Sequence, residues 1–334
     1  MESQPRLGRR HLLHAAAALV ATASLKPYVS AAQTPESVPL AMATFADKAA
    51  TARDLAQAWF LLLSATGSAS GELGTTDEMD AAAMAFIQPF LDPAFQLQRA
   101  NGERYVATTY VPVDIDLFSI EDLNETRPTD GLLVARYAVA APGSSTADTN
   151  LVLSSDLRPR LTVFRWDDAS AQWKVLSHAN FNVPIATICE EQPLVPVSDP
   201  PVPTSAEDVA LGVETVHALA AALLTGDIAS VHDPEVQVQN AGGIGGTTIR
   251  GLGENHYRTI ETSNHLVTRN ADVMVVSYRG LPSGIGLGAP IEEAWRPRLV
   301  SFRQDESGVW KVIASAVFST IADVPDTVQC MKAG

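Results

Sequence analysis

The residues best suited to acid–base chemistry lie on two predicted strands in the middle of the chain. His178 and Asn180 alternate along a predicted strand over 173–183, so their side chains share one face of it. An imidazole can give or take a proton near neutral pH. Tyr137, on an earlier predicted strand, is suited to donating a hydrogen bond to an oxygen that gains negative charge. These three residues form the first candidate pocket.

The opposite face of the His178 strand gives a competing interpretation. That face carries mostly apolar residues, namely Val175, Ala179, Phe181 and Val183, with Ser177 between them. A consistently apolar face is the natural core side of a strand. It predicts that His178 faces outward, toward water or another part of the chain. A chemical role for His178 requires the reverse, with its face lining a cavity.

A second group of candidates lies in the last third of the chain. Glu214 and His217 stand three residues apart on a predicted helix, and Tyr278 occupies a strand position that matches Tyr137. A polar side chain on a helix can face the interior of a fold. A histidine beside alanine and leucine is more often partly buried by packing, however, and matched tyrosines are more often core aromatics. We therefore favour a packing role for this group.

Two arginines offer an anion site. Arg158 and Arg160 share one face of a predicted strand, because they are two positions apart. Arg296 and Arg298 repeat the pair later in the chain. A repeated pair favours a structural role, in which the aliphatic stems cover the sheet.

The other motifs do not indicate a metal or a cofactor. Glu254, His256, Glu261 and His265 cluster in sequence, but the two histidines lack the i, i+4 spacing of a helical zinc site. The glycine-rich segments 242–246 and 284–288 are typical of hairpin loops, since neither joins a strand to a helix in a βαβ unit. We therefore expect no metal and no cofactor.

Composition and charge exclude some classes of partner. The 334 residues include 23 basic and 38 acidic ones, which gives a formal net charge of −15. Such a chain should repel nucleic acid and anionic membrane surfaces. The hydrophobic content of 46% is that of a globular protein, and the length suggests about two domains.

The N-terminal segment has the order of an export signal. Basic residues precede an apolar stretch over 14–25, and small residues follow at 30–32. Arg9 and Arg10 resemble the pair of a twin-arginine signal. Residues 1–32 are therefore predicted to direct export to the periplasm or the exterior, and we expect no membrane association once they are removed.

The two cysteines, Cys189 and Cys330, both belong to the predicted exported part. An oxidising compartment would permit a disulfide between them. Two buried free thiols are the alternative.

The most informative feature is an internal duplication. Residues 158–181 align with 296–318 after one gap, and shorter matches upstream keep the same order and nearly the same spacing. The period is far longer than that of a solenoid repeat, so the chain contains two tandem copies of one domain. We place the copies at 41–188 and 207–323, with a proline-rich linker at 189–206 and a C-terminal tail at 324–334.

Each copy is predicted to begin with helix and to end with strands. Copy one has predicted helices over 45–65 and 77–90, whereas copy two has one, which starts near Ser205 with acidic residues in its first turn. A short strand and a variable middle follow. The last three strands are predicted at 130–140, 158–166 and 173–183 in copy one, and at 272–279, 296–304 and 310–321 in copy two. Helices before an antiparallel sheet indicate an α+β fold.

This layout resembles the nuclear transport factor 2-like superfamily, which includes the SnoaL-like domains. The opening helix, Asp92-Pro93 or Asp233-Pro234 before a short strand, and the final hairpin carry the resemblance. It implies a cone, in which a curved antiparallel sheet wraps around N-terminal helices and encloses a cavity. It also implies frequent dimerisation through the outer face of the sheet. The shortened helical region of copy two departs from the pattern and puts a closed cavity there in doubt.

Fold alone does not choose the activity, because the superfamily includes both binding domains and cofactor-free enzymes. We favour non-catalytic binding of a small apolar ligand or a protein partner, with the two copies paired within the chain as a pseudo-dimer. The alternative is a cofactor-free lyase, isomerase or hydrolase that acts on a small apolar substrate in one cone. An enzyme requires a cavity in which polar groups with shifted pKa values converge.

Overall fold

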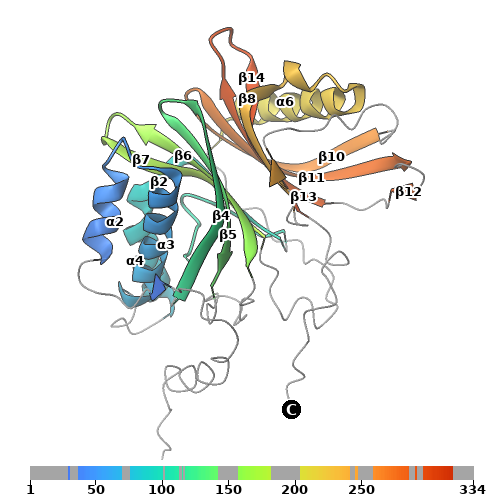
Figure 1. The fold of residues 1–334 in the computed structure, drawn as a ribbon. Coiled ribbons are helices and arrows are strands. Elements are labelled where there is room, and N and C mark those ends of the chain that lie inside the picture. The colour runs from blue at the N-terminus through green and yellow to red at the C-terminus, as the bar shows by residue number, and fades with distance from the viewer. Residues whose placement is uncertain are drawn as a thin grey trace, which may run out of the picture.

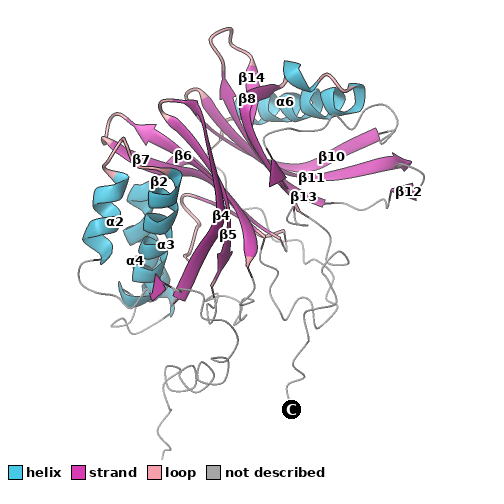
Figure 2. Cartoon of the chain, in the orientation of Figure 1, coloured by secondary structure: helices cyan, strands magenta, loops and turns pink. Residues whose placement is uncertain are grey.

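The structure is a computed structural model that describes residues 29–30, 37–69, 76–100, 102–112, 115, 117–141, 157–181, 204–240, 245–246, 259–285, 290–291 and 296–318. Two sheets pack face to face in the middle of the molecule (Figure 1). Helices cover the face of each sheet that points away from the other sheet (Figure 2). The predicted α+β class, with helices packed on curved sheets, is confirmed.

The first copy begins with three helices, α2 (Ser37–Phe45), α3 (Ala52–Ala69) and α4 (Thr76–Ile87), before a 3-10 turn at Gln88–Phe90. The single helix predicted over 45–65 was wrong, because the chain turns between α2 and α3. Thr51 and Asp54 cap the start of α3 reciprocally, with the Asp54 amide donating to Thr51 Oγ1 and the Thr51 amide donating to Asp54 Oδ2. A threonine followed three residues later by an acid is a known N-terminal signature. The break was therefore readable in the sequence.

The first sheet has the strand order β1-β4-β5-β6-β7-β2-β3. All its pairs are antiparallel except that of β2 with β7, so the sheet is mixed rather than purely antiparallel. The long strand β4 lies in a region that the sequence left as variable. The strands are β1 (Val29–Ser30), β2 (Leu91–Arg99), β3 (Arg104–Val106), β4 (Leu117–Thr129), β5 (Leu132–Ala140), β6 (Arg158–Asp167) and β7 (Gln172–Asn180).

The second sheet repeats this order after one helix, α6 (Ala206–Thr225), and a 3-10 turn at Ile228–Ser230. Its order is β10-β11-β13-β14-β8-β9, with β12 paired to β11, and β8 with β14 is its parallel pair. Two sheets of matching order indicate two domains. The strands are β8 (His232–Asn240), β9 (Gly245–Gly246), β10 (Thr259–Asn270), β11 (Val273–Ile285), β12 (Pro290–Ile291), β13 (Arg296–Gln304) and β14 (Trp310–Val317).

Several predictions fall outside the described residues. These are the proposed disulfide between Cys189 and Cys330, most of the linker at 189–206, the tail at 324–334 and nearly all of the signal at 1–32. Strand β1 is the one described part of the signal segment, and it pairs with Leu117 and Phe118 at the start of β4. The domain boundaries stay predictions.

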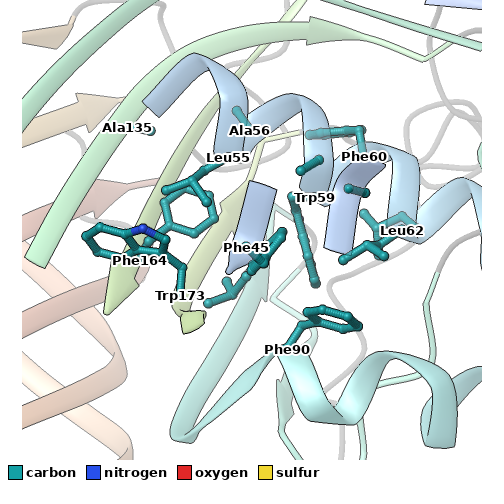
Figure 3. Packing of buried hydrophobic residues seen from close by; sticks show 14 of the residues in the cluster. Phe45, Leu55, Ala56, Trp59, Phe60, Leu62, Phe90, Ala135, Phe164 and Trp173 are labelled. Carbon is teal, nitrogen blue, oxygen red and sulfur yellow. The ribbon is translucent and has the colours of Figure 1, made fainter. Parts of the chain in front are cut away.

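Aromatic residues fill the space between α2–α4 and the first sheet. Figure 3 shows Trp59 and Phe60 of α3 in a cluster with Phe45, Phe90 and Phe164. The rings of Phe45 and Phe90 meet edge to face at 5.2 Å between centroids, a favourable geometry for aromatic pairs. The side chains of the cone therefore occupy most of its interior.

A β-bulge decides which side chains of β7 enter this cone. Val163 pairs with Ser177 and Phe164 pairs with Val175, so Leu176 is an extra residue in β7. The alternation of faces shifts by one position at the bulge. Val175 packs inside the cone, whereas Leu176 and Ala179 pack against the second domain. The same bulge recurs in β14, between Val312 and Ala314.

The two sheets share a continuous apolar core. The rings of Phe181 and Phe318, at matching positions of the two copies, stack at 4.4 Å between centroids. The buried Gln96 amide donates to the Leu266 and Val275 carbonyl oxygens and to Thr268 Oγ1 across the interface. The sheet faces that lie outside the two cones meet each other here, so they are as buried as the cone interiors.

A buried ion pair lies beside this interface in each domain. Arg165 contacts Asp92 at 3.2 Å in the first domain, and Arg303 contacts Asp233 at the matching position of the second. Asp92 also accepts from Asn270 Nδ2 of the second domain. Asp92 therefore links the two domains as well as two strands of its own sheet.

Helix α6 begins where the sequence predicted. Ser205 Oγ accepts from the Asp208 amide, and Gly226 ends the helix in the left-handed conformation. Among the described residues, α6 is the one helix long and apolar enough to meet the length and composition expected of a membrane span. Its alanine- and leucine-rich sequence packs Val216 and Leu219 onto the second sheet.

The closest approach of α6 to the second sheet is at Gly212. A Cβ atom there would lie 2.6 Å from both methyl carbons of Val267 on β10. Gly212→Ala is expected to lower the free energy of unfolding by about 1–3 kcal/mol through overpacking. Urea unfolding followed by circular dichroism measures this change. A gain of about 1 kcal/mol, the helix-propensity benefit of alanine over glycine, would contradict the close packing.

Candidate functional site

The interior of the first cone contains the polar residues singled out by the sequence. Strands β5, β6 and β7 lie side by side, and their register places Tyr137 opposite Arg160 and Thr162 opposite His178. His178 is almost fully buried, and its ring meets Trp59 and Phe60 of α3 edge-on. The prediction that His178 faces outward was wrong. The bulge at Leu176 turns it inward, and the apolar face opposite packs on the second domain.

Three of these side chains form a hydrogen-bonded chain. Tyr137 Oη and Thr162 Oγ1 are 2.9 Å apart, as are Thr162 Oγ1 and His178 Nδ1. Burial raises the pKa of Tyr137 to about 12, so its hydroxyl keeps its proton. Burial first, and the charges of Arg160 and Arg99 second, lower the pKa of His178 well below 6.5. The imidazole is therefore neutral at pH 7.

Hydrogen-bond accounting assigns the proton on the His178 ring. Thr162 Oγ1 is the one acceptor of the Tyr137 hydroxyl proton among the described residues. The Thr162 hydroxyl proton then has His178 Nδ1 as its acceptor, so every proton of the chain is used. A neutral imidazole that accepts at Nδ1 carries its proton on Nε2. His178 thus presents a donor to whatever occupies the cone.

A small cavity adjoins this group. Its volume is about 20 Å³, enough for about one water molecule. Its polar lining residues are Arg99, Arg160, His178 and Asn180. Its other lining residues are Phe60, Leu63, Leu97, Ile115, Ala141 and the aromatic Tyr110. A largely apolar lining with a few polar groups is the usual composition of a small-molecule site.

The two arginines of the cavity differ in their partners. Arg99 Nη1 lies 2.6 Å from Glu103 Oε2 in a mostly buried ion pair. Arg160 donates from Nη1 to the carbonyl oxygens of Arg158 and Pro159, and its Nε has no acceptor among the described residues. Burial lowers the pKa of Arg160 to about 10, which leaves it charged at pH 7.

The second cone does not repeat this arrangement. Its tyrosine and arginine remain, with Tyr278 opposite Arg298 in register. Val300 and Ser315 stand where the first cone has Thr162 and His178, so the hydrogen-bonded chain is lost. One helix, α6, covers this sheet where three cover the first.

Two of the candidates in the second domain, His217 and Tyr278, both contact His265. Tyr278 is buried and stacks on His265 at 5.8 Å between ring centroids, and His265 meets His217 at 6.0 Å. Both His217 and Glu214 are exposed. Burial lowers the pKa of His265, with a smaller contribution from the charge of His217. Within the described residues, no group of three or more histidine, cysteine or acidic side chains has the geometry to hold a metal ion.

Sequence reasoning missed Thr162 and undervalued Arg160. Both share a face of β6, and the alternation of Arg158, Arg160 and Thr162 was readable. Their convergence with His178 required the bulge in β7, for which the sequence carries no signal. Tyr110 and Arg99 were missed because neighbouring segments bring them to the cavity through long-range packing.

No family model and no curated protein matches the chain. Several solved structures resemble part of it. A nuclear transport factor 2-like protein from Cytophaga hutchinsonii shares 17% identity over 35% of this chain and 99% of its own, with a TM-score of 0.30. A putative ketosteroid isomerase from Shewanella frigidimarina shares 20% identity over 32% of this chain and 93% of its own, with a TM-score of 0.26. The association domain of C. elegans CaMKII shares 14% identity over 34% of this chain and 100% of its own, with a TM-score of 0.28.

The neutral state of His178 predicts a pH dependence of stability. The unfolded chain takes up a proton on this histidine below about pH 6.5, whereas the folded chain does not until a much lower pH. Stability is therefore lost as the pH falls below about 6.5. Between pH 7.5 and 5.5 this one group should lower the free energy of unfolding by about 1.4 kcal/mol.

The variant His178→Asn isolates that contribution, because burial also lowers the pKa values of His232 and His265 in both proteins. Urea unfolding at pH 7.5 and 5.5 should show a loss about 1.4 kcal/mol smaller in the variant than in the unmodified chain. Equal losses in the two proteins would contradict a neutral, buried His178.

Proposed function

We propose that this protein binds a small molecule in the interior of the first cone, without catalysing a reaction. The cavity carries the proposal, because it joins an apolar wall to the buried polar groups of Arg160 and His178. Unpartnered buried donors cost free energy, and a bound acceptor would offset that cost. The second domain, without such a group, serves as the scaffold.

The pairing of the sheets supports that division of roles. The two sheet faces that lie outside the cones meet each other. Their apolar residues form one core, centred on the stacked rings of Phe181 and Phe318. We infer that the second domain takes the place of the second copy in the dimers that the family resemblance implies. The mature chain should therefore be a monomer in solution, measured by sedimentation or light scattering.

The binding proposal can be tested with the mature chain, residues 33–334, and a library of small fragments. The nitrogen chemical shifts of the His178 ring report on the cone, and those of the exposed His217 serve as the control. Binding fragments are expected to shift the His178 signals and to leave the His217 signals unchanged. If no fragment moves the His178 signals, the proposal fails.

A cofactor-free lyase, isomerase or hydrolase in the same cone is the second candidate. The observation that favours it is the Tyr137–Thr162–His178 chain, since a neutral imidazole can polarise a carbonyl group. Such reactions also require a base, and no carboxylate lines the cavity within the described part of the chain. Turnover of a bound carbonyl compound that disappears in His178→Asn would favour this candidate over binding alone.

We also propose that the protein is exported by its twin-arginine-type N-terminus to the periplasm or the exterior, where it has no membrane and no nucleic-acid partner. The sequence order of residues 1–32 and the net charge of −15 support this. Replacement of Arg9 and Arg10 by lysine is expected to retain the precursor in the cytoplasm, as measured by cell fractionation. Unchanged export of that variant would contradict a twin-arginine route.

A further inference from the structure

Arg160 is a buried cation without an anionic partner among the residues that the structure describes. Its side chain is 2% exposed, and no carboxylate lies within ion-pair distance among the described residues. Three other arginines on strands differ from it. Arg99, Arg165 and Arg303 each contact a carboxylate.

A buried charge of this kind is costly unless something compensates it. Two backbone carbonyl oxygens accept from Nη1, and they supply only partial charge. Within the described part of the chain, Nε has no acceptor, and both of the side-chain hydrogen bonds of Arg160 come from Nη1. Removing an ion from water without a counter-charge costs several kcal/mol in real proteins. Since the guanidinium borders the cavity, a bound anion is the simplest compensation.

The neighbours of Arg160 at the cavity are compatible with an anion. His178 presents its Nε2 proton, by the accounting of the Tyr137–Thr162 chain. The Arg99 charge is balanced by Glu103, so one positive charge remains uncompensated. One charge matches a monoanion and not a doubly charged phosphate. The planar guanidinium also matches the geometry of a carboxylate.

The rest of the cavity limits the body of the ligand. The cavity wall also contains apolar side chains, with Phe60, Leu63 and Leu97 among them. The volume of about 20 Å³ leaves room for a very small group unless the aromatic side chains move. A short aliphatic chain fits this wall better than a polar or extended one.

We propose that the first cone binds a small monocarboxylate with a short apolar body, held through its carboxylate by Arg160 and His178. This assignment rests on the proposed function of that cone, and it adds the chemical class of the ligand. Both residues donate, and the carboxylate accepts. The second cone does not bind such a ligand, because Arg298 is only partly buried there and Ser315 replaces the histidine.

The test compares isobutyrate with isobutyramide, which has the same shape without the charge, by calorimetry on the mature chain at pH 7 in chloride-free buffer. Formate, acetate, propionate and benzoate complete a size series. Isobutyrate is expected to bind at least tenfold more tightly than isobutyramide. Arg160→Met should abolish that preference. Arg298→Met, the matching change in the second cone, should retain it.

Each other outcome counts against the assignment. Equal binding of the acid and the amide would overturn the carboxylate class while leaving small-molecule binding intact. Binding of chloride that isobutyrate does not displace would also overturn it. Absence of binding by every compound, charged or neutral, would remove the proposed function as well. If Arg160→Met does not fold, Arg160→Lys and the acid–amide comparison on the unmodified chain still decide.

Discussion

Asp92→Ala is expected to lower the free energy of unfolding by about 3–5 kcal/mol. The Asp92 side chain is 1% exposed, and its carboxylate accepts from Arg165 Nη1, from Asn270 Nδ2 and from the Ala94 amide. Its removal leaves Arg165 without its buried partner and breaks one contact between the domains. Loss of one member of a buried pair costs more than the pair contributes, because the remaining charge stays desolvated.

The chain offers a matched control for this change. Asp272 contacts the other terminal nitrogen of the same Arg165 at 3.1 Å, but its side chain is 60% exposed. Asp272→Ala should change the free energy of unfolding by less than about 1 kcal/mol. Urea unfolding of both variants at pH 7 measures the contrast. Equal losses of unfolding free energy in the two variants would show that burial does not determine how much Asp92 contributes to stability.

Phe181→Ala is expected to cost about 3–5 kcal/mol of folding free energy. Phe181 stacks on Phe318 at the centre of the core that the two sheets share, and both rings are nearly fully buried. Truncation opens a cavity between two sheets that other contacts hold in place, such as the bond between the hydroxyls of Ser177 and Ser301. The surroundings can therefore close that cavity only in part.

A double-mutant cycle with Phe318→Ala separates the stacking from the burial. If the rings interact directly, the double variant should lose about 0.5–1.5 kcal/mol less than the sum of the single losses. Unfolding followed by tryptophan fluorescence and by circular dichroism gives the three values. Additive losses would contradict direct packing of the two domains through this pair.

The sequence indicated much of the architecture because the duplication provides two examples of most strands. The final hairpins, β6–β7 and β13–β14, were predicted at nearly their observed bounds, since their turns carry acidic and glycine residues. Strands β4 and β10 were missed. Both contain irregular pairing and several polar residues, so neither shows a regular alternation.

The site was only partly readable for a different physical reason. The rule that an apolar face is the core side assumes that the opposite face meets water. In β7 both faces are buried, one by α3 and the other by the second sheet. When both faces of a strand are buried, a polar face indicates a candidate site and not contact with water. His178 and Asn180 lie on that polar face and line the cavity. The bulge at Leu176 also contributed to the wrong prediction, because it shifts which side chains of the strand point to each face.

Binding of a small carboxylate against Arg160, in the interior of the first cone, can be seen in a crystal structure. Crystals of residues 33–334 grown with 3-bromopropionate are suitable, because the anomalous signal of bromine locates the ligand without bias. We predict a bromine peak beside Phe60 and Leu63, with the carboxylate within hydrogen-bond distance of Arg160 and His178. Ordered water alone in this cavity, with bromine elsewhere or absent, would contradict the account.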